Sequence, residues 1–183
     1  MTTTLESALD VLFGWNFRNS LDQSTTRDVD RLRHQEGITN GTGDNQANEM
    51  WHDRRWVTAG SPTDDIDLRG VLTNAFGQTV NFTKIKTIVI ENLGVPTDGR
   101  GGDEFTPTAG EDLLIGGEGV NPFDDWANAD NDAKIRLGSG GLLVLTNPLD
   151  GWDVTASTAD LLRVANGGTT DIVYKIILEG IKE

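Results

Sequence analysis

Apolar and polar side chains alternate along much of this chain, and a two-residue period is the pattern of a β-strand with one buried face. The alternation is clearest in residues 171–179, where every even-numbered position is apolar. Residues 160–165 form a second apolar stretch, and the tetrapeptide Asn-Gly-Gly-Thr at 166–169 separates the two. Asn and Gly adopt a positive φ at little cost, so this tetrapeptide is suited to reversing the chain. The pattern predicts a β-hairpin over residues 160–179.

Similar patterns predict further strands at 51–58, 65–73, 83–92, 113–115, 134–137, 142–145 and 152–155. The strand at 83–92 becomes apolar on both faces at Ile88-Val89-Ile90, which predicts that another sheet, a loop or a neighbouring subunit covers its second face. The apolar run at 142–145 predicts a buried strand. Residues 19–48 are mostly polar and predict only a weak strand, at 29–32.

The first residues of the chain carry two competing patterns. Thr3 and Glu6 have the spacing of a helix-capping box. Apolar residues in this segment recur at helical intervals, at Leu5, Ala8, Leu9 and Leu12. From residue 10 onward the odd-numbered positions are large and apolar, which is the strand period. We therefore expect residues 1–10 to form an extended or partly helical N-terminal arm, followed by a strand through Arg18.

These elements amount to nine or ten short strands without a long helix. There is no internal repeat and no break in composition that would separate two domains. Sheets with one apolar face must stack on another apolar layer. The sequence therefore predicts a single all-β domain over residues 1–183. We expect an antiparallel, jelly-roll-like β-sandwich with a short N-terminal arm and long loops, glycine-rich at 94–110 and acidic at 121–132.

Composition narrows the classes of function. The formal net charge is −14, which argues against binding to a phosphate backbone, since that needs a basic surface. The chain has no cysteine, so disulfides and thiolate metal sites are excluded. The residues after Met1 lack a basic region followed by a long apolar run, and no stretch approaches the length of a membrane span. We expect a protein that is made and used without a secretion signal.

No motif in the chain predicts a catalytic, cofactor or metal site. Asn128, Asp130 and Asp132 match the start of an EF-hand loop, but Ala133 stands where glycine is needed and Ser139 where a bidentate Glu is needed. The two histidines lie at unrelated positions and have no zinc-ligand spacing. A Ser-His-Asp arrangement is left open, because such triads are recognised by geometry rather than by spacing. We expect no enzyme activity and no cofactor.

The five tryptophans suggest stacking on sugar rings as another possible activity. Trp15 and Trp56 lie at strand positions, where packing in the core is the expected role. Trp126 lies in the acidic loop and is expected to be the most exposed of the five. Binding of a glycan at Trp126 is therefore the carbohydrate hypothesis that the sequence supports.

Several passages in order along the chain carry a resemblance to a known group of proteins. They are residues 15–22 (WNFRNSLD), 51–53 (WHD), 72–77 (LTNAFG), 84–90 (KIKTIVI), 115–117 (IGG), 140–145 (GGLLVL) with Pro148, and 151–166 (GWDVTASTADLLRVAN). This order resembles small β proteins encoded by tailed bacteriophages, and most of all the capsid cement (decoration) proteins with a jelly-roll body. The resemblance covers about residues 15–179. The segments 1–10 and 94–110 have no place in it.

The resemblance implies a structural protein of the virion, made in the host cytoplasm, that binds the exterior of the capsid. Such a protein would bind the major capsid protein, commonly as a homotrimer, and bridge capsomers against the pressure of packaged DNA. It would need no nucleic acid or membrane contact. We expect subunit or capsid contacts at Leu5, Leu9 and Leu12, and at Ile88 and Ile90. The alternatives are another head or tail component, or a carbohydrate-binding β-sandwich module of a phage adhesion device.

Overall fold

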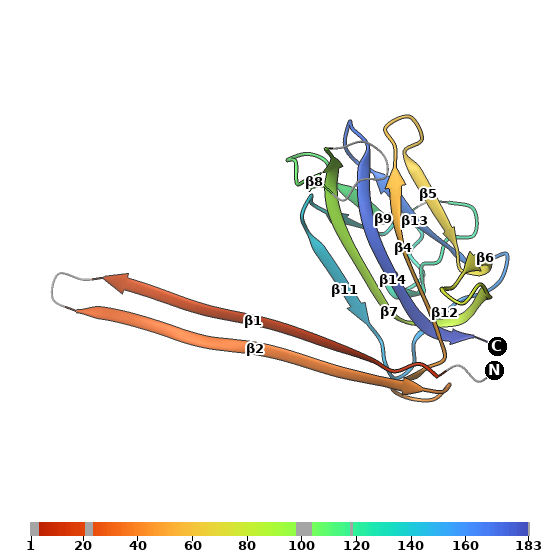
Figure 1. The fold of residues 1–183 in the computed structure, drawn as a ribbon, viewed down its shortest axis with the longest axis horizontal. Coiled ribbons are helices and arrows are strands. Elements are labelled where there is room, and N and C mark those ends of the chain that lie inside the picture. The colour runs from red at the N-terminus through yellow and green to blue at the C-terminus, as the bar shows by residue number, and fades with distance from the viewer. Residues whose placement is uncertain (1–3, 21–23, 98–103, 118, 183) are drawn as a thin grey trace.

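The computed structural model describes residues 4–20, 24–97, 104–117 and 119–182. It consists almost entirely of β-strands, and a sandwich-shaped body carries a long two-stranded arm that projects away from it (Figure 1). The first and last described residues, Thr4 and Lys182, line one hollow and so lie near each other. The expected all-β fold is confirmed.

The body is an antiparallel β-sandwich of two sheets. The larger sheet has the strand order β11-β7-β14-β4, and β6, β8 and β12 also pair with β7. Its strands are β4 (Glu49–Val57), β6 (Arg69–Thr73), β7 (Thr79–Pro96), β8 (Phe105–Thr106), β11 (Leu142–Thr146), β12 (Trp152–Asp153) and β14 (Ile172–Lys182). The smaller sheet has the order β10-β9-β13-β5. It consists of β5 (Thr63–Asp67), β9 (Leu113–Gly116), β10 (Lys134–Leu137) and β13 (Leu161–Asn166), and one short 3-10 helix, η1 (Asp125–Ala127), precedes β10.

The hydrophobic core fills the space between the two sheets. Phe82 and Tyr174 are among its largest fully buried side chains. Ile88 and Ile90 also belong to this core, and each is at most 1% exposed. The prediction that these two isoleucines form a subunit or capsid contact is therefore wrong for the folded body. Val89 is the residue of this run that lies on the outer face of the larger sheet.

The hairpin predicted over residues 160–179 does not form. Both of its strands exist, as β13 and β14, but they do not pair with each other. β13 pairs with β5 and β9 in the smaller sheet, and β14 pairs with β4 and β7 in the larger one. The turn at 166–171 therefore carries the chain across the sandwich. Glu111 holds this crossing, because its carboxylate accepts hydrogen bonds from the amides of Thr169 and Thr170.

Other differences are local. The single strand expected at 65–73 is interrupted at Leu68, which is fully buried, so β5 and β6 belong to different sheets. β11 lies at the edge of the larger sheet rather than in its centre, and Leu142 at its start is 62% exposed. Residues 7–10 are strand and not helix. The part of the arm prediction that concerns residues 1–3 falls outside the described residues.

The arm is a β-hairpin of two long strands, β1 (Ser7–Ser20) and β2 (Thr25–Asn40). They pair without a break from Ser7 opposite Ile38 to Ser20 opposite Thr25. At about 3.4 Å per residue, fourteen paired residues extend roughly 45 Å. Beyond Asn40 the chain makes a short parallel contact between β2 and β3 (Gln46–Ala47) and enters the body. The polar stretch at 19–48, expected to hold only a weak strand, thus supplies one of the two longest strands of the protein.

Candidate functional site: a projecting arm with two different faces

The arm exposes an unusual share of the apolar surface of the protein. Among the described residues, twelve large hydrophobic side chains are exposed, and six of them are on the arm. These are Val11, Leu12, Phe13, Phe17, Val29 and Leu32. A two-stranded ribbon is at best marginally stable in water by itself, and clustered exposed apolar residues mark interaction surfaces. The arm is therefore the strongest candidate for a functional site.

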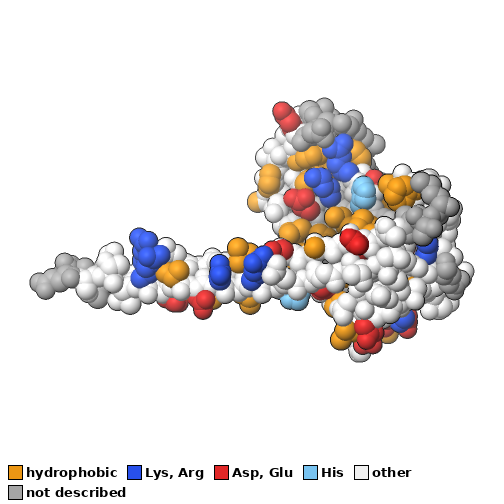
Figure 2. All heavy atoms as spheres, turned by 60° about the horizontal axis from the view of Figure 1, so that its bottom comes forward, with side chains coloured by type: hydrophobic (Ala, Val, Ile, Leu, Met, Phe, Trp, Pro, Cys, Tyr) orange, Lys and Arg blue, Asp and Glu red, His pale blue; other side chains and the backbone are white. Residues whose placement is uncertain are grey.

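The register of β1 with β2 divides the arm into two chemically different faces, because directly opposed residues share a face and faces alternate along each strand. One face, called here the arginine face, comprises Asp10, Leu12, Gly14, Asn16, Arg18, Arg27, Val29, Arg31, Arg33 and Gln35. The other, called here the aromatic face, comprises Leu9, Val11, Phe13, Trp15, Phe17, Asp28, Asp30, Leu32, His34 and Glu36. Figure 2 shows basic side chains along one side of the arm and most of its acidic side chains along the other.

The aromatic face is organised around Trp15. Its indole Nε1 donates a hydrogen bond to Asp28 Oδ2 on the opposite strand, at 3.2 Å. The ring of Phe13 lies beside it, with the two ring centroids 6.2 Å apart. Trp15 was expected to pack in a core, and in the structure it lies out on the arm, half-buried by its neighbours on the ribbon. The aromatic face thus combines apolar rings with carboxylates on the neighbouring strand.

Arg33 is the one arginine of the arginine face with a carboxylate partner among the described residues. Its Nε donates to Asp10 Oδ1 at 3.0 Å, and its Nη2 donates to Asp10 Oδ2. These hydrogen bonds, together with the charge of Arg33, hold the pKa of Asp10 below its ordinary value. Arg18 and Arg27 lie directly opposite each other, and the Nε of each donates to Asn16 Oδ1 at 3.1 Å. Like charges in directly opposed positions destabilise a ribbon, so this pair favours an anionic partner.

The root of the arm is fixed to the body by buried contacts. Ser7 Oγ donates to Glu179 Oε1 of β14 at 2.6 Å, and Ile38 is 4% exposed. On the other side of the root, the buried Lys86 donates from Nζ to the carbonyl oxygens of Pro148, at 2.9 Å, and Leu149. The carbonyl of Pro148 also accepts the amide of Asn45, so the segment that follows the arm is held as well. The arm therefore projects from an anchored base.

A hollow of about 290 Å³ lies where the aromatic face meets the outer face of the larger sheet. Its apolar walls come from both parts, at Leu9, Ile38, Met50, Val89 and Ile177. Two carboxylates line it, Glu36 of the arm and Glu179 of β14. The Glu36 side chain is only 8% exposed, and its buried Oε1 has no hydrogen-bond partner among the described residues. We call this hollow the root pocket.

Glu179 gives the root pocket a pH-dependent stability. Burial raises the pKa of Glu179, and the charge of Glu36 raises it further, although hydrogen bonds from Ser7 and Thr87 act in the opposite direction. Because the folded state binds this proton more tightly than the unfolded chain does, the ionised carboxylate costs stability at neutral pH. That cost disappears as the pH falls through the raised pKa.

Glu179→Gln is therefore expected to raise the free energy of unfolding at pH 7, since it removes a buried charge and keeps an acceptor for Ser7. Ser7→Ala should have the opposite effect and lower it by about 1 kcal/mol, through the loss of one hydrogen bond to the buried carboxylate. Urea unfolding at pH 7 and at pH 5 measures both. If Glu179→Gln raises the free energy of unfolding by as much at pH 5 as at pH 7, the inference that the ionised Glu179 costs stability is wrong.

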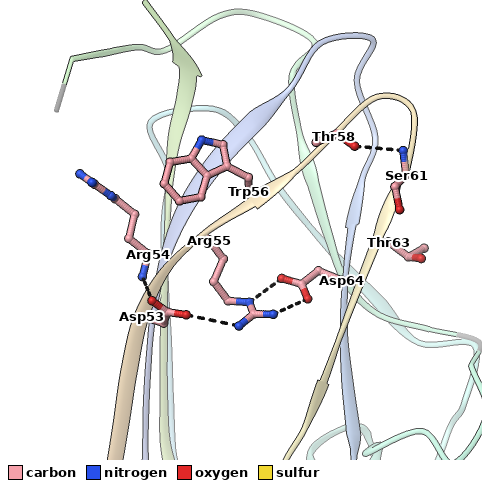
Figure 3. A pocket seen from close by; sticks show the side chains of 8 residues that line it. All are labelled: Asp53, Arg54, Arg55, Trp56, Thr58, Ser61, Thr63 and Asp64. Carbon is pink, nitrogen blue, oxygen red and sulfur yellow. Dashed lines mark hydrogen bonds and ion pairs between the residues drawn. The ribbon is translucent and has the colours of Figure 1, made fainter. Parts of the chain in front are cut away.

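A second hollow, of about 510 Å³, lies beside β4 and β5. Figure 3 shows the guanidinium of Arg55 between Asp53 and Asp64, with Trp56 to one side. Arg55 binds Asp64 with two hydrogen bonds, of 2.6 and 2.7 Å, and Tyr174 donates its hydroxyl to the same carboxylate at 2.7 Å. The guanidinium carbon of Arg54 lies 5.6 Å from the ring centroid of Trp56. The charged groups here bind one another, and Trp56 Nε1 is the one buried side-chain donor of the hollow without a partner among the described residues, so the hollow is better explained as a link between β4 and β5 than as a ligand site.

The structure separates the leucines that the sequence grouped at helical spacing. Leu5 and Leu9 are half-buried at the root, and Leu9 lines the root pocket. Leu12 lies on the arginine face and is 61% exposed. The strand period puts Leu9 and Leu12 on opposite faces, whereas a helix would have put them on one. The sequence did not lead us to predict a role for the arginines of β2. Residues 27, 31 and 33 are all odd-numbered, and in a strand such positions lie on the same face.

The other sequence candidates do not gather into a site. Trp126 is half-buried against the core, and its indole donates to the carbonyl of Phe123 at 3.0 Å, so the prediction of an exposed ring is wrong. Within the described part of the chain no group of His, Asp and Glu side chains could hold a metal ion. No helix among the described residues is long and apolar enough to cross a membrane.

No model of a protein family matches the chain, and no characterised protein matches its sequence significantly.

Proposed function

We propose that this protein is a structural component of a bacteriophage virion, a cement protein that binds the exterior of the capsid and bridges neighbouring subunits. The observation that carries the proposal is the arm. It extends roughly 45 Å from an anchored root, and beyond Leu9 and Glu36 most of its side chains on both faces are exposed in the described structure. An arm of this length can reach an adjacent molecule in an assembly. In a protein without partners, its exposed apolar side chains would have no role.

Two further features support this function. The chain carries 29 acidic residues against 15 basic ones, which suits the outside of a shell, where contact with packaged DNA is undesirable. The passages that resemble capsid cement proteins include residues 15–22, of which 15–20 lie on the arm, as well as strands of the body. In this proposal the partner is the major capsid protein, the assembly is a homotrimer, and the location is the capsid exterior. No step requires catalysis.

Shortening the arm tests the proposal. In the test variant an Asn-Gly turn replaces residues 14–31 and joins Phe13 to Leu32, which are opposite each other in the register. We expect the intact protein to co-sediment with capsids assembled without it, at a fixed ratio to the major capsid protein. The shortened variant should bind at least about tenfold more weakly, equivalent to about 1.4 kcal/mol or more.

The control for this experiment is the stability of the body, measured by urea unfolding, which the shortening should leave nearly unchanged because the core lies outside the arm. If the intact protein stays in the supernatant, the cement function is wrong. If the shortened variant binds as well as the intact chain, the arm is not the bridging element.

The tryptophan rings in the described structure do not form a surface on which a sugar ring could stack. The rings of Trp126 and Trp152 pack against the core, Trp51 is buried, and Arg54 lies over Trp56. Trp15 is bonded to Asp28 and lies on the arm, and its ring does not line the root pocket. No observation favours a sugar ligand over a protein partner, so we propose only the structural role.

A further inference from the structure

The two faces of the arm are chemically complementary to each other, yet they lie on opposite sides of one ribbon and cannot meet within one chain. We propose that the arms of neighbouring copies of this protein stack, with the arginine face of one copy lying on the aromatic face of the next. This inference concerns self-association and stands independently of attachment to a capsid. It identifies the partner of the arm as a second copy of this chain.

Three arginines of the arginine face have no carboxylate acceptor within the described part of their own chain. Among the described residues, Arg18, Arg27 and Arg31 have no carboxylate partner, and Arg18 and Arg27 are directly opposed. The guanidinium group prefers a bidentate carboxylate or the face of an aromatic ring. The face has exposed apolar residues as well, at Leu12 and Val29, which would be covered by an apolar counterpart.

The aromatic face supplies both kinds of acceptor. Asp28 and Asp30 alternate along β2, and Trp15 and Phe17 lie directly opposite them on β1. An arginine placed on this face would therefore meet a ring and a carboxylate together, which is the arrangement that its planar charged group binds best. The exposed Phe13 and Leu32, opposite each other, offer the apolar counterpart for Leu12 and Val29.

The root pocket completes the aromatic face at its inner end. The buried Oε1 of Glu36 is an acceptor without a partner among the described residues, and the walls around it are aliphatic. A buried unpaired carboxylate oxygen costs free energy until a donor reaches it. An arginine fits this pocket, because its aliphatic stem packs on apolar walls while its head binds a carboxylate. The stacked arm of the second copy would supply that side chain.

The symmetry of the assembly follows from the contact. Each copy uses one face to hold a neighbour and the opposite face to be held, so the contact is heterologous and not that of a two-fold dimer. It builds a ring where the rotation between copies closes and an open stack where it does not. One face of the arm measures roughly 45 Å by 10 Å, so each contact buries roughly 900 Å² in total, at the low end of specific interfaces. We therefore expect assembly at micromolar concentration, weakened by salt because most of the contact is exposed to solvent.

The test uses two variants of the full chain that each break a different face. Arg27→Glu with Arg31→Glu breaks the arginine face, and Asp28→Arg with Asp30→Arg breaks the aromatic face. Light scattering should give the intact protein a mass that is a multiple of 19.8 kDa, and each variant alone should be monomeric, with at least tenfold weaker association. In an equimolar mixture the intact aromatic face of the first variant meets the intact arginine face of the second. The two altered faces carry reversed and again opposite charges, so the mixture should regain the association that each variant alone has lost.

A control variant with the same charge change as the second one, Asp130→Arg with Asp132→Arg, alters an exposed loop of the body and should assemble like the intact protein. Circular dichroism confirms that all variants fold. The proposal is overturned if the intact protein is monomeric up to about 100 μM, or if either face variant keeps the intact mass. It is also overturned if the mixture remains monomeric. Assembly without capsid binding would leave this inference standing and remove the cement function, whereas capsid binding by a monomer would do the reverse.

Discussion

Replacing Asp64 by Ala is expected to lower the free energy of unfolding by about 3 kcal/mol, which is a large fraction of the stability of an ordinary domain. Asp64 accepts two hydrogen bonds from Arg55 and one from the hydroxyl of Tyr174. The Tyr174 residue is fully buried and the Asp64 side chain is only 14% exposed, so the Tyr174 hydroxyl loses an acceptor that water replaces poorly. Burial and the charge of Asp64 both raise the pKa of Tyr174, which therefore stays a donor.

The cost arises because this cluster joins the two layers of the sandwich. Asp64 belongs to β5 in the smaller sheet, whereas Arg55 and Tyr174 belong to β4 and β14 in the larger one. The matched control is Asp53→Ala, which removes a weaker contact to the same arginine, at 3.3 Å, from a side chain that is 46% exposed. That change should cost at most about 0.5 kcal/mol.

Urea unfolding of the two variants measures the difference. A double-mutant cycle of Asp64→Ala with Tyr174→Phe should show a coupling of about 1 kcal/mol or more, since the two side chains share one hydrogen bond. If Asp64→Ala and Asp53→Ala cost the same, the inter-layer cluster contributes nothing beyond an ordinary surface contact, and this account of it is wrong.

Replacing Gly180 by Ala is expected to destabilise the body by about 3 kcal/mol, through a clash between backbones rather than through a lost contact. A Cβ on Gly180 would lie 2.0 Å from the carbonyl oxygen of Lys84 and 3.1 Å from the Cα of Ile85. Both are backbone atoms of β7, the strand paired with β14, so no flexible side chain can move aside. The pairing of these strands shifts register between Glu179 and Gly180, which brings the two chains close at this point.

Gly60→Ala is the control for this prediction. A Cβ at Gly60 would meet nothing within 4 Å, and this residue lies in the turn between β4 and β5. We expect its stability to change by less than about 0.5 kcal/mol, since the position is open and the gain from a less flexible unfolded chain is small. Thermal unfolding of both variants provides the comparison. Equal melting temperatures for the two variants would show that β7 and β14 can separate locally at no cost.

The residues that stabilise the fold and the residues proposed to bind partners lie in different parts of the molecule. The interior of the sandwich holds nearly all of the buried apolar side chains, and the described part of the arm contributes only Ile38, at its root. Changes on the outer arm are therefore expected to alter association and leave the fold intact, whereas changes at Asp64 or Gly180 should unfold the body. This separation makes the arm variants informative, because a loss of binding can be attributed to the surface that was changed.

The residue pattern by itself determined that the protein is all-β, and it placed most strands of the body. The alternation in β10 and β14 is strong because each has one face in a core, and burial imposes a two-residue period on any such strand. It also indicated the turns, since glycine and asparagine are needed where φ is positive, as at Gly77 and Gly140. These are local requirements, and a local pattern is sufficient to show them.

Only the tertiary structure decided which strands are partners. β13 and β14 are consecutive, each has an apolar face, and the turn between them could close a hairpin, yet they lie in different sheets. Alternation shows that a strand buries one face, but it does not show which edge it pairs with. The arm shows the same limit, because β2 is polar, buries almost nothing and so leaves no hydrophobic period to read. Its strand is held by pairing with β1, and the complementary faces arise from that register, which no single strand contains.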